Sequence, residues 1–258
     1  MVTPSYQQGS FIGATISSVV NQRYPKLDYV VQDGQSTDST ADVLSRWSDH
    51  GVRSAIESDT GQANAINRGF GRVDGEIMGW LNSDDVLLPG ALDAVAEVFA
   101  TRADVDVVYG HRVIIDAHGS DIGRWIMPPH DTAVLRWADY IPQETMFWRR
   151  RLWDDVGGSI DETFRFAVDW DLILRFVDAG ATFARIPKFL GGFRVHAAQK
   201  TSAKMESTGE AEMMQLRQRS LGRAVDYPEI NANVRPYLIS ASLCHAAWKL
   251  GVLRYGGV

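Results

Sequence analysis

The first half of the chain alternates short β-like runs with segments of helical periodicity, and this alternation constrains the fold more than any other feature. The β-like runs are Leu27–Asp33, Gly51–Ser58, Glu76–Leu81 and Val105–Gly110. The segments between them have the spacing of amphipathic helices: Phe11–Gln22, Ala41–Trp47, Gln62–Arg72 and Ala91–Ala100. Such alternation predicts βαβ units and therefore an α/β fold with a mostly parallel central sheet. The chain opens almost inside its first predicted strand, Met1–Ser5, so this strand is short or the native start lies upstream.

The second half has a less regular pattern. We expect Val107–Met127 to fold back on itself as extended chain, followed by a short helix and a strand, Thr132–Ala138 and Thr145–Trp148. A helix at Asp169–Gly180 should end at its glycine, and Ala181–His196 should hold two short strands. From Thr201 onward the pattern is helical, with breaks expected at Pro228 and Pro236.

Composition excludes several classes of protein. The 258 residues are 45% hydrophobic and 22% charged, which is typical of a soluble globular protein. A net charge of −6 argues against a general nucleic-acid binder, which needs a basic surface. Cys244 is the single cysteine, so an intramolecular disulfide and a multi-cysteine zinc site are excluded. No signal peptide is visible, and the longest apolar stretch, Tyr237–Leu253, is too short for a membrane span. A cytoplasmic protein is the simplest expectation.

Polar residues gather where four predicted strands end. Ligands of open parallel sheets bind beyond the carboxyl ends of the strands, so these ends should share one site. The four polar stretches are Thr3–Tyr6, Asp33–Thr40, Glu57–Gly69 and Asn82–Asp85. Asp38 could simply cap the helix that follows it. Asp33 stands directly before Gly34 and should point into the crevice, where it can accept a hydrogen bond from a base or a ribose.

Asp84 and Asp85 follow a run that reads as a buried strand. Adjacent carboxylates repel each other and resist desolvation, so fold stability does not account for them. A solvated loop is one interpretation. The other is a hard divalent cation, which prefers carboxylate oxygens and leaves coordination positions open for phosphate.

Three stretches together resemble glycosyltransferase family 2: Val2–Thr40, Asp59–Phe70 and Gly75–Leu92. The similarity extends over roughly residues 2–200. It implies the A-type glycosyltransferase fold, a single Rossmann-like domain, here with C-terminal helices added. By this resemblance residues 1–110 bind the nucleotide-sugar donor, residues 111–200 bind the acceptor and carry the catalytic base, and residues 201–258 form a helical appendage.

The resemblance also assigns roles to single residues. The donor-binding residues it implies are Thr3, Pro4, Ser5, Tyr6, Asp33, Asp59, Gln62, Asn82 and Ser83. Mn²⁺ or Mg²⁺ would bind Asp84, with Asp85 and His196 beside it, and bridge the diphosphate. His196 could instead be an ordinary histidine at a strand end. Asn82 departs from the family pattern, which often has Asp there; it can still bind a ribose hydroxyl but adds no charge.

Asp169 matches the family's catalytic base, although Val168 replaces the glutamate that usually precedes it. A structural alternative is that Asp169 caps a helix whose dipole Asp171 complements. Gln143, Glu144 and Trp170 are candidate acceptor residues. Strand-edge hydrogen bonding is the alternative for the first two, and core packing is the alternative for Trp170.

Together these features predict a metal-dependent, inverting glycosyltransferase. It would move a sugar from a nucleotide-diphospho-sugar, by default a UDP-sugar, to a hydroxyl of a saccharide, lipid-linked or other acceptor, in cell-wall, polysaccharide or glycolipid synthesis. One alternative is a catalytically degenerate sugar-nucleotide-binding or scaffold protein, because of Asn82 and Val168. A nucleotidyltransferase is less favoured, because no Gly-rich loop with Lys or Arg follows the first strand. An oxidoreductase is disfavoured because G-x-G-x-x-G is absent there. The C-terminal helices could contact a membrane surface or a second copy of the chain.

Overall fold

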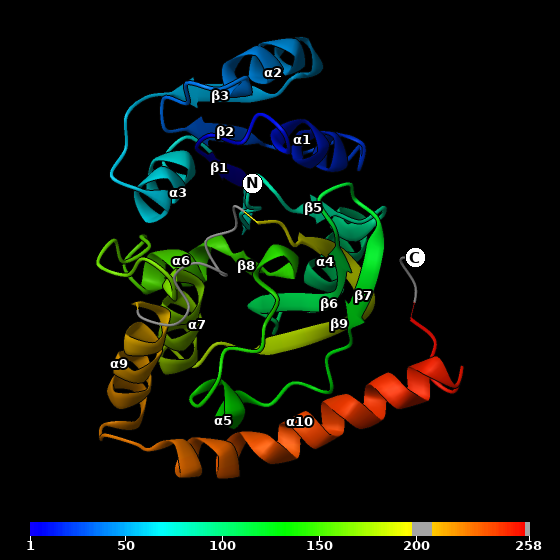
Figure 1. The fold of residues 1–258 in the computed structure, drawn as a ribbon, viewed down its shortest axis with the longest axis vertical. Coiled ribbons are helices and arrows are strands. Elements are labelled where there is room, and N and C mark those ends of the chain that lie inside the picture. Colours follow the sequence, from blue (N-terminus) through cyan, green and yellow to red (C-terminus); the bar gives the residue numbers. More distant parts are fainter. Residues whose placement is uncertain (198–207, 256–258) are drawn as a thin grey trace.

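The computed structural model describes residues 1–197 and 208–255. The first half forms a three-stranded parallel sheet in the order β1-β2-β3. Its strands are β1 (Val2–Ser5), β2 (Val30–Asp33) and β3 (Arg53–Ile56). Its helices are α1 (Ile12–Val20), α2 (Thr40–Trp47), the 3-10 turn η1 (Ser48–His50) and α3 (Gln62–Phe70). This sheet and its helices lie at the top of the molecule in Figure 1.

Beside β1 runs the segment that leads to the adjacent acids. Val2 is bridged in parallel to Trp80, and its amide donates to the Gly79 carbonyl at 3.2 Å. The ends of the strands are in register, since Ser5 pairs with Asp33 and Asp33 pairs with Ile56. The chain segment before Asn82 therefore brings that residue to the same sheet edge as the end of β1, as the sequence predicts.

A six-stranded sheet forms the body of the molecule, in the order β4-β8-β6-β9-β5 with β7 paired to β6. Its strands are β4 (Ile77–Met78), β5 (Val86–Leu87), β6 (Val107–Ile115), β7 (Asp121–Trp125), β8 (Phe147–Arg149) and β9 (Phe183–Arg194). Only β6 and β9 are parallel to each other among these pairs. The α/β class is confirmed, but the parallel arrangement is limited to the first sheet and this pair.

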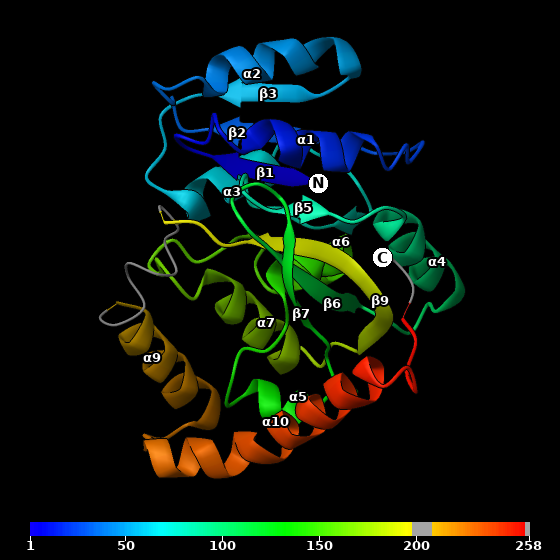
Figure 2. The same cartoon turned by 45° about the vertical axis from the view of Figure 1, so that its right-hand side comes forward.

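Seven helical elements accompany the second sheet in the described residues. They are α4 (Ala91–Thr101), α5 (Thr132–Leu135), the 3-10 turn η2 (Gln143–Thr145), α6 (Arg150–Asp155), α7 (Val168–Asp178), α9 (Glu210–Leu221) and α10 (Tyr227–Lys249). Figure 1 shows α10 along the bottom of the molecule, while α9 stands at its side next to α7. Figure 2 shows the same arrangement after a turn of the molecule.

Two expectations about elements are wrong. The predicted pair of strands in Ala181–His196 is one twelve-residue strand, β9. It stays paired with β6 because register shifts on both sides of His111 absorb the irregularity. Pro236 does not break the C-terminal helix but lies inside α10, whereas Pro228 stands in its first turn. The expected appendage, residues 201–258, is described only from 208 to 255.

Four of the eight tryptophans, Trp80, Trp148, Trp153 and Trp170, are buried in the core. Trp148 is fully buried and meets Trp80 edge to face, with 5.6 Å between the ring centroids. Phe70 of α3 packs on the same ring at 5.7 Å. Edge-to-face pairs of this kind add to the area that they bury. The core therefore joins α3, which packs on the first sheet, to the second sheet.

Candidate active site

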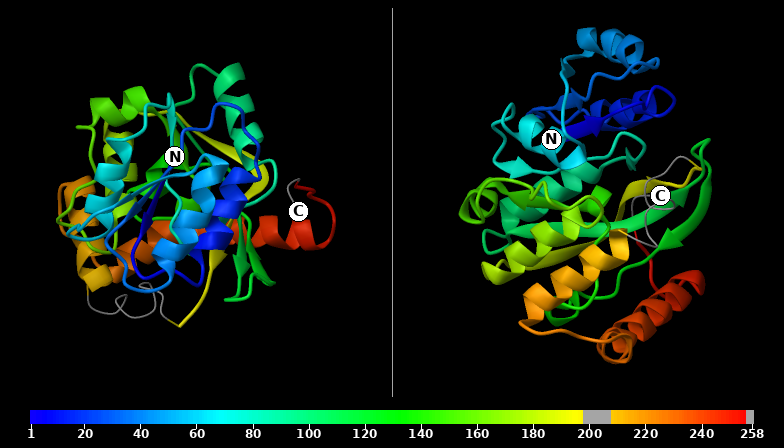
Figure 3. Two further views of the ribbon diagram at one scale, coloured as in Figure 1. Left: turned by 90° about the horizontal axis from the view of Figure 1, so that it is seen from above. Right: turned by 60° about the vertical axis from the view of Figure 1, so that its left-hand side comes forward.

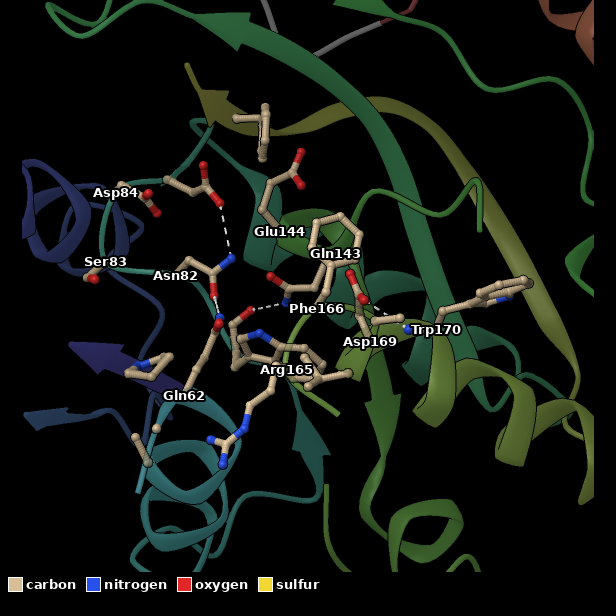
Figure 4. Close-up of a pocket in the computed structure, with 18 of the residues that line it drawn as sticks. Gln62, Asn82, Ser83, Asp84, Gln143, Glu144, Arg165, Phe166, Asp169 and Trp170 are labelled. Carbon is tan, nitrogen blue, oxygen red and sulfur yellow. Dashed lines mark hydrogen bonds between the residues drawn. The ribbon is translucent and has the colours of Figure 1, made fainter. Parts of the chain in front are cut away.

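A cavity of about 690 Å³ opens between the edge of the first sheet and the start of α7. Of the predicted site residues, it is lined by Pro4, Ser5, Tyr6, Asp59, Gln62, Asn82, Ser83, Asp84, Asp85, Gln143, Glu144, Asp169 and Trp170. Figure 4 shows Asn82, Ser83 and Asp84 on one side of the cavity and Asp169 on the other, with Gln143 and Glu144 between them. The fold thus brings together residues that are up to 166 positions apart.

Three predicted site residues, Thr3, Asp33 and His196, do not line this cavity. The hydroxyl of Thr3 is fully buried and lies 2.9 Å from the Tyr29 hydroxyl. Both carboxylate oxygens of Asp33 are engaged by Ser36, which donates its amide at 2.8 Å and its hydroxyl at 2.7 Å. In this structure Thr3 and Asp33 therefore shape the loops that border the donor side, and their predicted contacts with a nucleotide stay predictions.

Asp59 lies at the end of the β3 segment and shapes the donor side. Its carboxylate accepts the Gly61 amide at 2.9 Å, which fixes the turn that begins α3. Gly34 lies so close that a Cβ there would be 2.7 Å from an oxygen of Asp59. A side chain at position 34 would push this carboxylate away, so the glycine allows the two loops to meet.

Asn82 connects α3 to the adjacent acids. Its side-chain oxygen accepts from Gln62 at 2.8 Å, and its amide group donates to Asp85 at 3.5 Å. An aspartate at this position could not donate to Asp85 and would add a third carboxylate to the cluster. The departure from the family pattern therefore has a physical reason in this chain.

The adjacent acids have different surroundings, as the sequence predicts. Asp84 is partly exposed, and its carboxylate lies 3.1 Å from Nε2 of His196. Asp85 is buried, and its carboxylate accepts the Arg194 amide at 2.9 Å. Burial raises the pKa of Asp85 well above its usual range, and the charges of Asp84 and Glu144 add to this effect. Both acids line the cavity, Asp84 as the partly exposed one and Asp85 as the buried one.

The donor set fits a divalent cation only in part. Among residues 1–197 and 208–255, no group of three or more His, Cys, Asp or Glu side chains is arranged to hold a metal ion. Asp84 and His196 form a pair of adjacent donors. Mg²⁺-type sites commonly use one or two carboxylates plus substrate phosphates rather than a complete protein cage. This pair is therefore compatible with a cation whose coordination a diphosphate completes.

Glu144 is not a free acid, because it forms a buried ion pair with Arg112. The two side chains meet through two hydrogen bonds, of 2.8 and 2.5 Å. The guanidinium also lies over the ring of Phe193, 4.4 Å from its centroid. Burial opposes the charge of Arg112, but Glu144 outweighs it and raises the pKa of this side chain. Arg112 thereby places a fixed positive charge in the wall of the cavity.

Asp169 is the second residue of α7, and its carboxylate faces the cavity. One of its oxygens accepts the Trp170 amide at 2.9 Å. Burial raises the pKa of Asp169. A second acid, Asp139, lines the same cavity, and both burial and the charge of Asp169 raise the pKa of Asp139 well above its usual range.

Sequence reasoning missed Arg112 and Asp139. Arg112 comes two residues after the predicted strand Val105–Gly110 and lies within β6, which continues to Ile115. Asp139 lies in the loop after α5, where no strand is predicted to end. Only the pattern of β6 could have drawn attention to Arg112, because a charged residue interrupts an otherwise apolar run. Nothing in the local sequence distinguishes Asp139 from a surface loop residue.

Five residues of the cavity wall present buried polar atoms that find no hydrogen-bond partner within the described part of the chain. These atoms are Ser5 Oγ, Gln8 Oε1, Trp80 Nε1, Asp139 Oδ1 and Gln143 Oε1. Buried polar groups in native proteins are almost always paired, so a cluster of unpaired ones calls for an explanation. A polar ligand that fills the cavity and forms hydrogen bonds with these atoms is such an explanation.

Two candidate acceptor residues are turned toward the protein. Trp170 is fully buried, and its indole N–H donates to the Leu135 carbonyl at 2.8 Å. The amide of Gln143 donates to the Trp80 carbonyl at 2.8 Å, which ties η2 to the segment before Asn82. Trp170 therefore packs in the core. Gln143 can still accept a hydrogen bond from a ligand through its side-chain oxygen, which has no partner in the described part of the chain.

Comparison with known proteins agrees with this geometry. The profile of Glycosyl transferase family 2 matches residues 1–167, which is more than half of the chain. The chain belongs to Glycosyl transferase family 2. It is accordingly an enzyme of the glycosyltransferase class. The matched region ends two residues before Asp169, so the proposed base lies just outside it.

Several curated relatives are glycosyltransferases. An uncharacterised glycosyltransferase of Nostoc is 25% identical over 224 residues, which are 82% of this chain and 69% of the relative. The O-antigen biosynthesis protein RfbC of Myxococcus xanthus is 29% identical over 209 residues, but this chain covers only 16% of it. A PGL/p-HBAD biosynthesis glycosyltransferase of Mycobacterium bovis is 27% identical over 179 residues, 68% of each chain.

Solved structures confirm the fold. TarS of S. aureus in complex with UDP-GlcNAc superimposes with a TM-score of 0.70 at 16% identity, covering 93% of this chain and 71% of that one. The mannosyltransferase PcManGT of Pyrobaculum calidifontis, in complex with GDP-Man and Mn²⁺, gives a TM-score of 0.67 at 18% identity, with 96% and 74% covered. Both have the A-type glycosyltransferase fold expected from the sequence. No helix in residues 1–197 and 208–255 is long and apolar enough to cross a membrane.

Proposed function

We propose that this enzyme transfers a sugar from a nucleotide-diphospho-sugar to a hydroxyl group with inversion at the anomeric carbon. One observation carries the proposal: Asp84 and Asp169 lie on opposite sides of one cavity, Asp84 in the loop that follows β4 beside the end of β1 and Asp169 at the start of α7. A carboxylate at each side matches what the reaction needs, because the diphosphate leaves on one side and the acceptor attacks on the other.

Different residues of this chain would bind the donor and accept the proton. Ser5, Asp59 and Asn82 border the donor side and would hold the nucleoside, together with Pro4, Tyr6, Gln62 and Ser83. Asp169 would accept the proton of the acceptor hydroxyl while its oxygen bonds to the anomeric carbon. The bond from that carbon to the diphosphate breaks at the same time, and a nucleoside diphosphate leaves. General-base help of this kind contributes about 10²–10⁴-fold to the rate.

Mn²⁺ or Mg²⁺ is the proposed cofactor, held by Asp84 and His196 with Asp85 behind them. A bound cation would supply positive charge against the leaving diphosphate. The support is the donor pair at 3.1 Å and the complex of the mannosyltransferase neighbour with Mn²⁺. UDP-sugars remain the default donors, and the GDP-mannose bound by that neighbour makes GDP-sugars the first alternative.

A donor screen tests the proposed activity. The protein is incubated with UDP-, GDP- and dTDP-sugars and Mn²⁺, and release of nucleoside diphosphate and thermal stabilisation are measured. A donor at 100 times its Kd should stabilise the protein by about 2.7 kcal/mol. If one donor binds but is neither hydrolysed nor transferred to any acceptor, the degenerate-binder alternative replaces the enzyme. If none binds, the proposed donor class is wrong.

Two substitutions separate the proposed roles. Asp169→Asn should keep donor affinity but lose about 10²–10⁴-fold in kcat. Asp84→Asn should instead weaken Mn²⁺-dependent donor binding, which calorimetry with and without Mn²⁺ measures. Full activity of Asp169→Asn would show that another group is the base.

The surface of α10 supports contact with a membrane. Leu238, Ile239 and Leu243 are each more than half exposed on this helix. From residue 230 to the last residue the sequence has Arg235, Lys249 and Arg254 but no acid, although the whole chain has a net charge of −6. Apolar side chains flanked by basic ones suit an anionic lipid surface. We therefore propose that the enzyme works at a membrane surface, and the cytoplasmic face stays the predicted one.

A further inference from the structure

One carboxylate of α9 holds the loop that leads into α7. Glu212 accepts hydrogen bonds from three successive backbone amides, those of Arg165 at 2.8 Å, Phe166 at 2.8 Å and Ala167 at 2.9 Å. The residue as a whole is only 9% exposed. A buried carboxylate that accepts three amides is a strong local constraint, because hydrogen bonds to an ionised acceptor are roughly twice as strong as neutral ones.

The start of α7 needs such a partner. Ala167 occupies the N-cap position and has no side chain that can accept a hydrogen bond. The first amides of a helix have no partner inside the helix, and its N-terminus favours a negative charge. Glu212 accepts the amide of this N-cap residue and those of the two residues before it, so it anchors the entry to α7 and places a negative charge at the helix start. Within the first turn, the Trp170 amide is accepted by Asp169.

Other contacts join α9 to the same region. A Cβ at Gly209 would come within 2.9 Å of the Phe166 ring, so the glycine permits α9 to begin directly against the loop. Arg219 of α9 forms an ion pair of 2.6 Å with Asp171, a fully buried residue of α7. The right-hand view in Figure 3 and the view in Figure 2 both show α9 lying alongside α7.

The loop also reaches the donor side. The Arg165 side chain donates to the Thr60 carbonyl at 2.9 Å, next to the turn that Asp59 fixes. Phe166, Ala167 and Asp169 all line the cavity. The segment held by Glu212 is therefore the wall that carries the proposed base, and it connects that base to the donor loop.

We propose that Glu212 is a positioning residue for glycosyl transfer: it fixes residues 165–167 and so directs the Asp169 carboxylate into the cavity. This inference rests on the proposed role of Asp169 as the base. It gives the C-terminal part of the chain a function in catalysis, where the sequence suggests only an appendage. Since displacing a reacting group by about 1 Å can cost about 10²-fold in rate, loss of the contact should reach the chemistry.

The first test measures the loop itself and needs no substrate. Glu212→Ala and Glu212→Gln are compared with Glu210→Gln, a control at an exposed glutamate of the same helix. Hydrogen exchange of the amides of residues 165–167 should accelerate strongly in Glu212→Ala and less in Glu212→Gln, which keeps one oxygen acceptor. The control should exchange like the unaltered protein. Unchanged exchange in Glu212→Ala would show that Glu212 does not hold the loop.

The second test measures catalysis. Release of UDP from UDP-GlcNAc, or of GDP from GDP-mannose, is followed with Mn²⁺ across a range of pH. Glu212→Ala should lose about 10²-fold in kcat while its donor Kd changes by no more than about threefold. Burial raises the pKa of Asp169, so a loop that opens to water should lower that pKa and move the acid limb of the pH profile to lower pH.

A purely structural role has a different signature. It would lower the folded fraction, and with it the amplitude of activity, but would leave the acid limb and the kcat per folded molecule unchanged; that result overturns the proposal. Loss of kcat in Asp169→Asn together with normal kcat in Glu212→Ala would overturn it too. Full activity of Asp169→Asn would instead refute the base assignment, while the exchange result would still decide whether Glu212 holds the loop.

Discussion

Three carboxyl groups of the active-site cavity are held in surroundings that oppose their ionisation. Burial raises the pKa values of Asp85, Asp139 and Asp169. The charge of Arg112 in the cavity wall favours their ionisation, but this guanidinium is already paired with Glu144. A ligand-free protein therefore carries unfavourable electrostatic energy in its active site, as enzymes often do where stability and activity conflict.

A substitution at Asp139 can measure how much an ionised carboxyl group in the cavity lowers the free energy of unfolding. The folded-state pKa of Asp139 is raised, so the carboxyl group contributes stability at low pH that is lost as the pH rises through the folded pKa. Asp139→Asn removes the ionisation, and the variant should be more stable than the unaltered protein at about pH 8, by about 1 kcal/mol or 2–4 °C in Tm. The difference should shrink as the pH falls toward about 4.

Thermal unfolding across that pH range provides the measurement. Asp154→Asn, at an exposed position, is the control and should show no pH-dependent gain. If Asp139→Asn is less stable than the unaltered protein at every pH, the surroundings of Asp139 stabilise its ionised form. That result would contradict the argument that burial disfavours the charge.

The sequence predicts the acids that follow strands better than those that do not. Asp84 and Asp169 line one cavity as expected, because strand ends and helix starts are readable from local patterns. Asp33 shows the limit of that reasoning: a position beside the crevice does not decide which neighbour takes the carboxylate, and here Ser36 does. Arg112 and Asp139 enter the site only through tertiary packing, which no local pattern encodes.

At the scale of elements, β6 and β9 depend on close backbone approach. Gly110 of β6 lies against β9, where an added Cβ would be 2.5 Å from the Leu190 side chain and 2.8 Å from the Lys188 carbonyl. Gly110→Ala should destabilise the protein by about 1–3 kcal/mol, since overpacking forces backbone shifts. Gly13→Ala, on α1 with 3.4 Å to its nearest neighbour, should be stabilising by about 0.5–1 kcal/mol.

Urea unfolding of both variants tests the difference. If Gly110→Ala is as stable as Gly13→Ala, the two strands can separate without cost, and the close approach is not a constraint on the fold. The pair also controls for a general effect of replacing glycine, because only position 110 faces a backbone carbonyl at such a short distance.

Local periodicity predicts most helices and strands of the first half to within a few residues. The failures come from the second half and have physical reasons. Pro187 and two glycines make β9 look like two strands, but a neighbouring strand on each side supplies the pairing that the local sequence does not predict. Pro236 is tolerated within α10 although proline usually interrupts a helix.

At the scale of the molecule, the cavity draws on all three predicted parts of the chain. Asp59 and Asp84 come from the first, Gln143 and Asp169 from the second, and Met213 of α9 from the third. The predicted boundaries at residues 110 and 200 therefore divide a single site. The two C-terminal helices lie at different places: α9 stands beside α7, and α10 runs along the bottom of the molecule (Figure 1). Leu238, Ile239 and Leu243 of α10 are exposed and do not line the cavity.

The face of α10 leads to a prediction for the whole protein. It should sediment with vesicles that contain anionic phosphatidylglycerol, and much less with phosphatidylcholine vesicles, because Arg235, Lys249 and Arg254 favour negative headgroups. Leu238→Ser with Leu243→Ser should abolish sedimentation, and binding should weaken near 1 M salt, where the screening length is about 3 Å. Normal activity of this double variant on UDP-GlcNAc or GDP-mannose would show that its site is intact. If the protein is instead a dimer that these substitutions dissociate, and it does not bind vesicles, the face of α10 is an interface with a second copy and the membrane proposal is wrong.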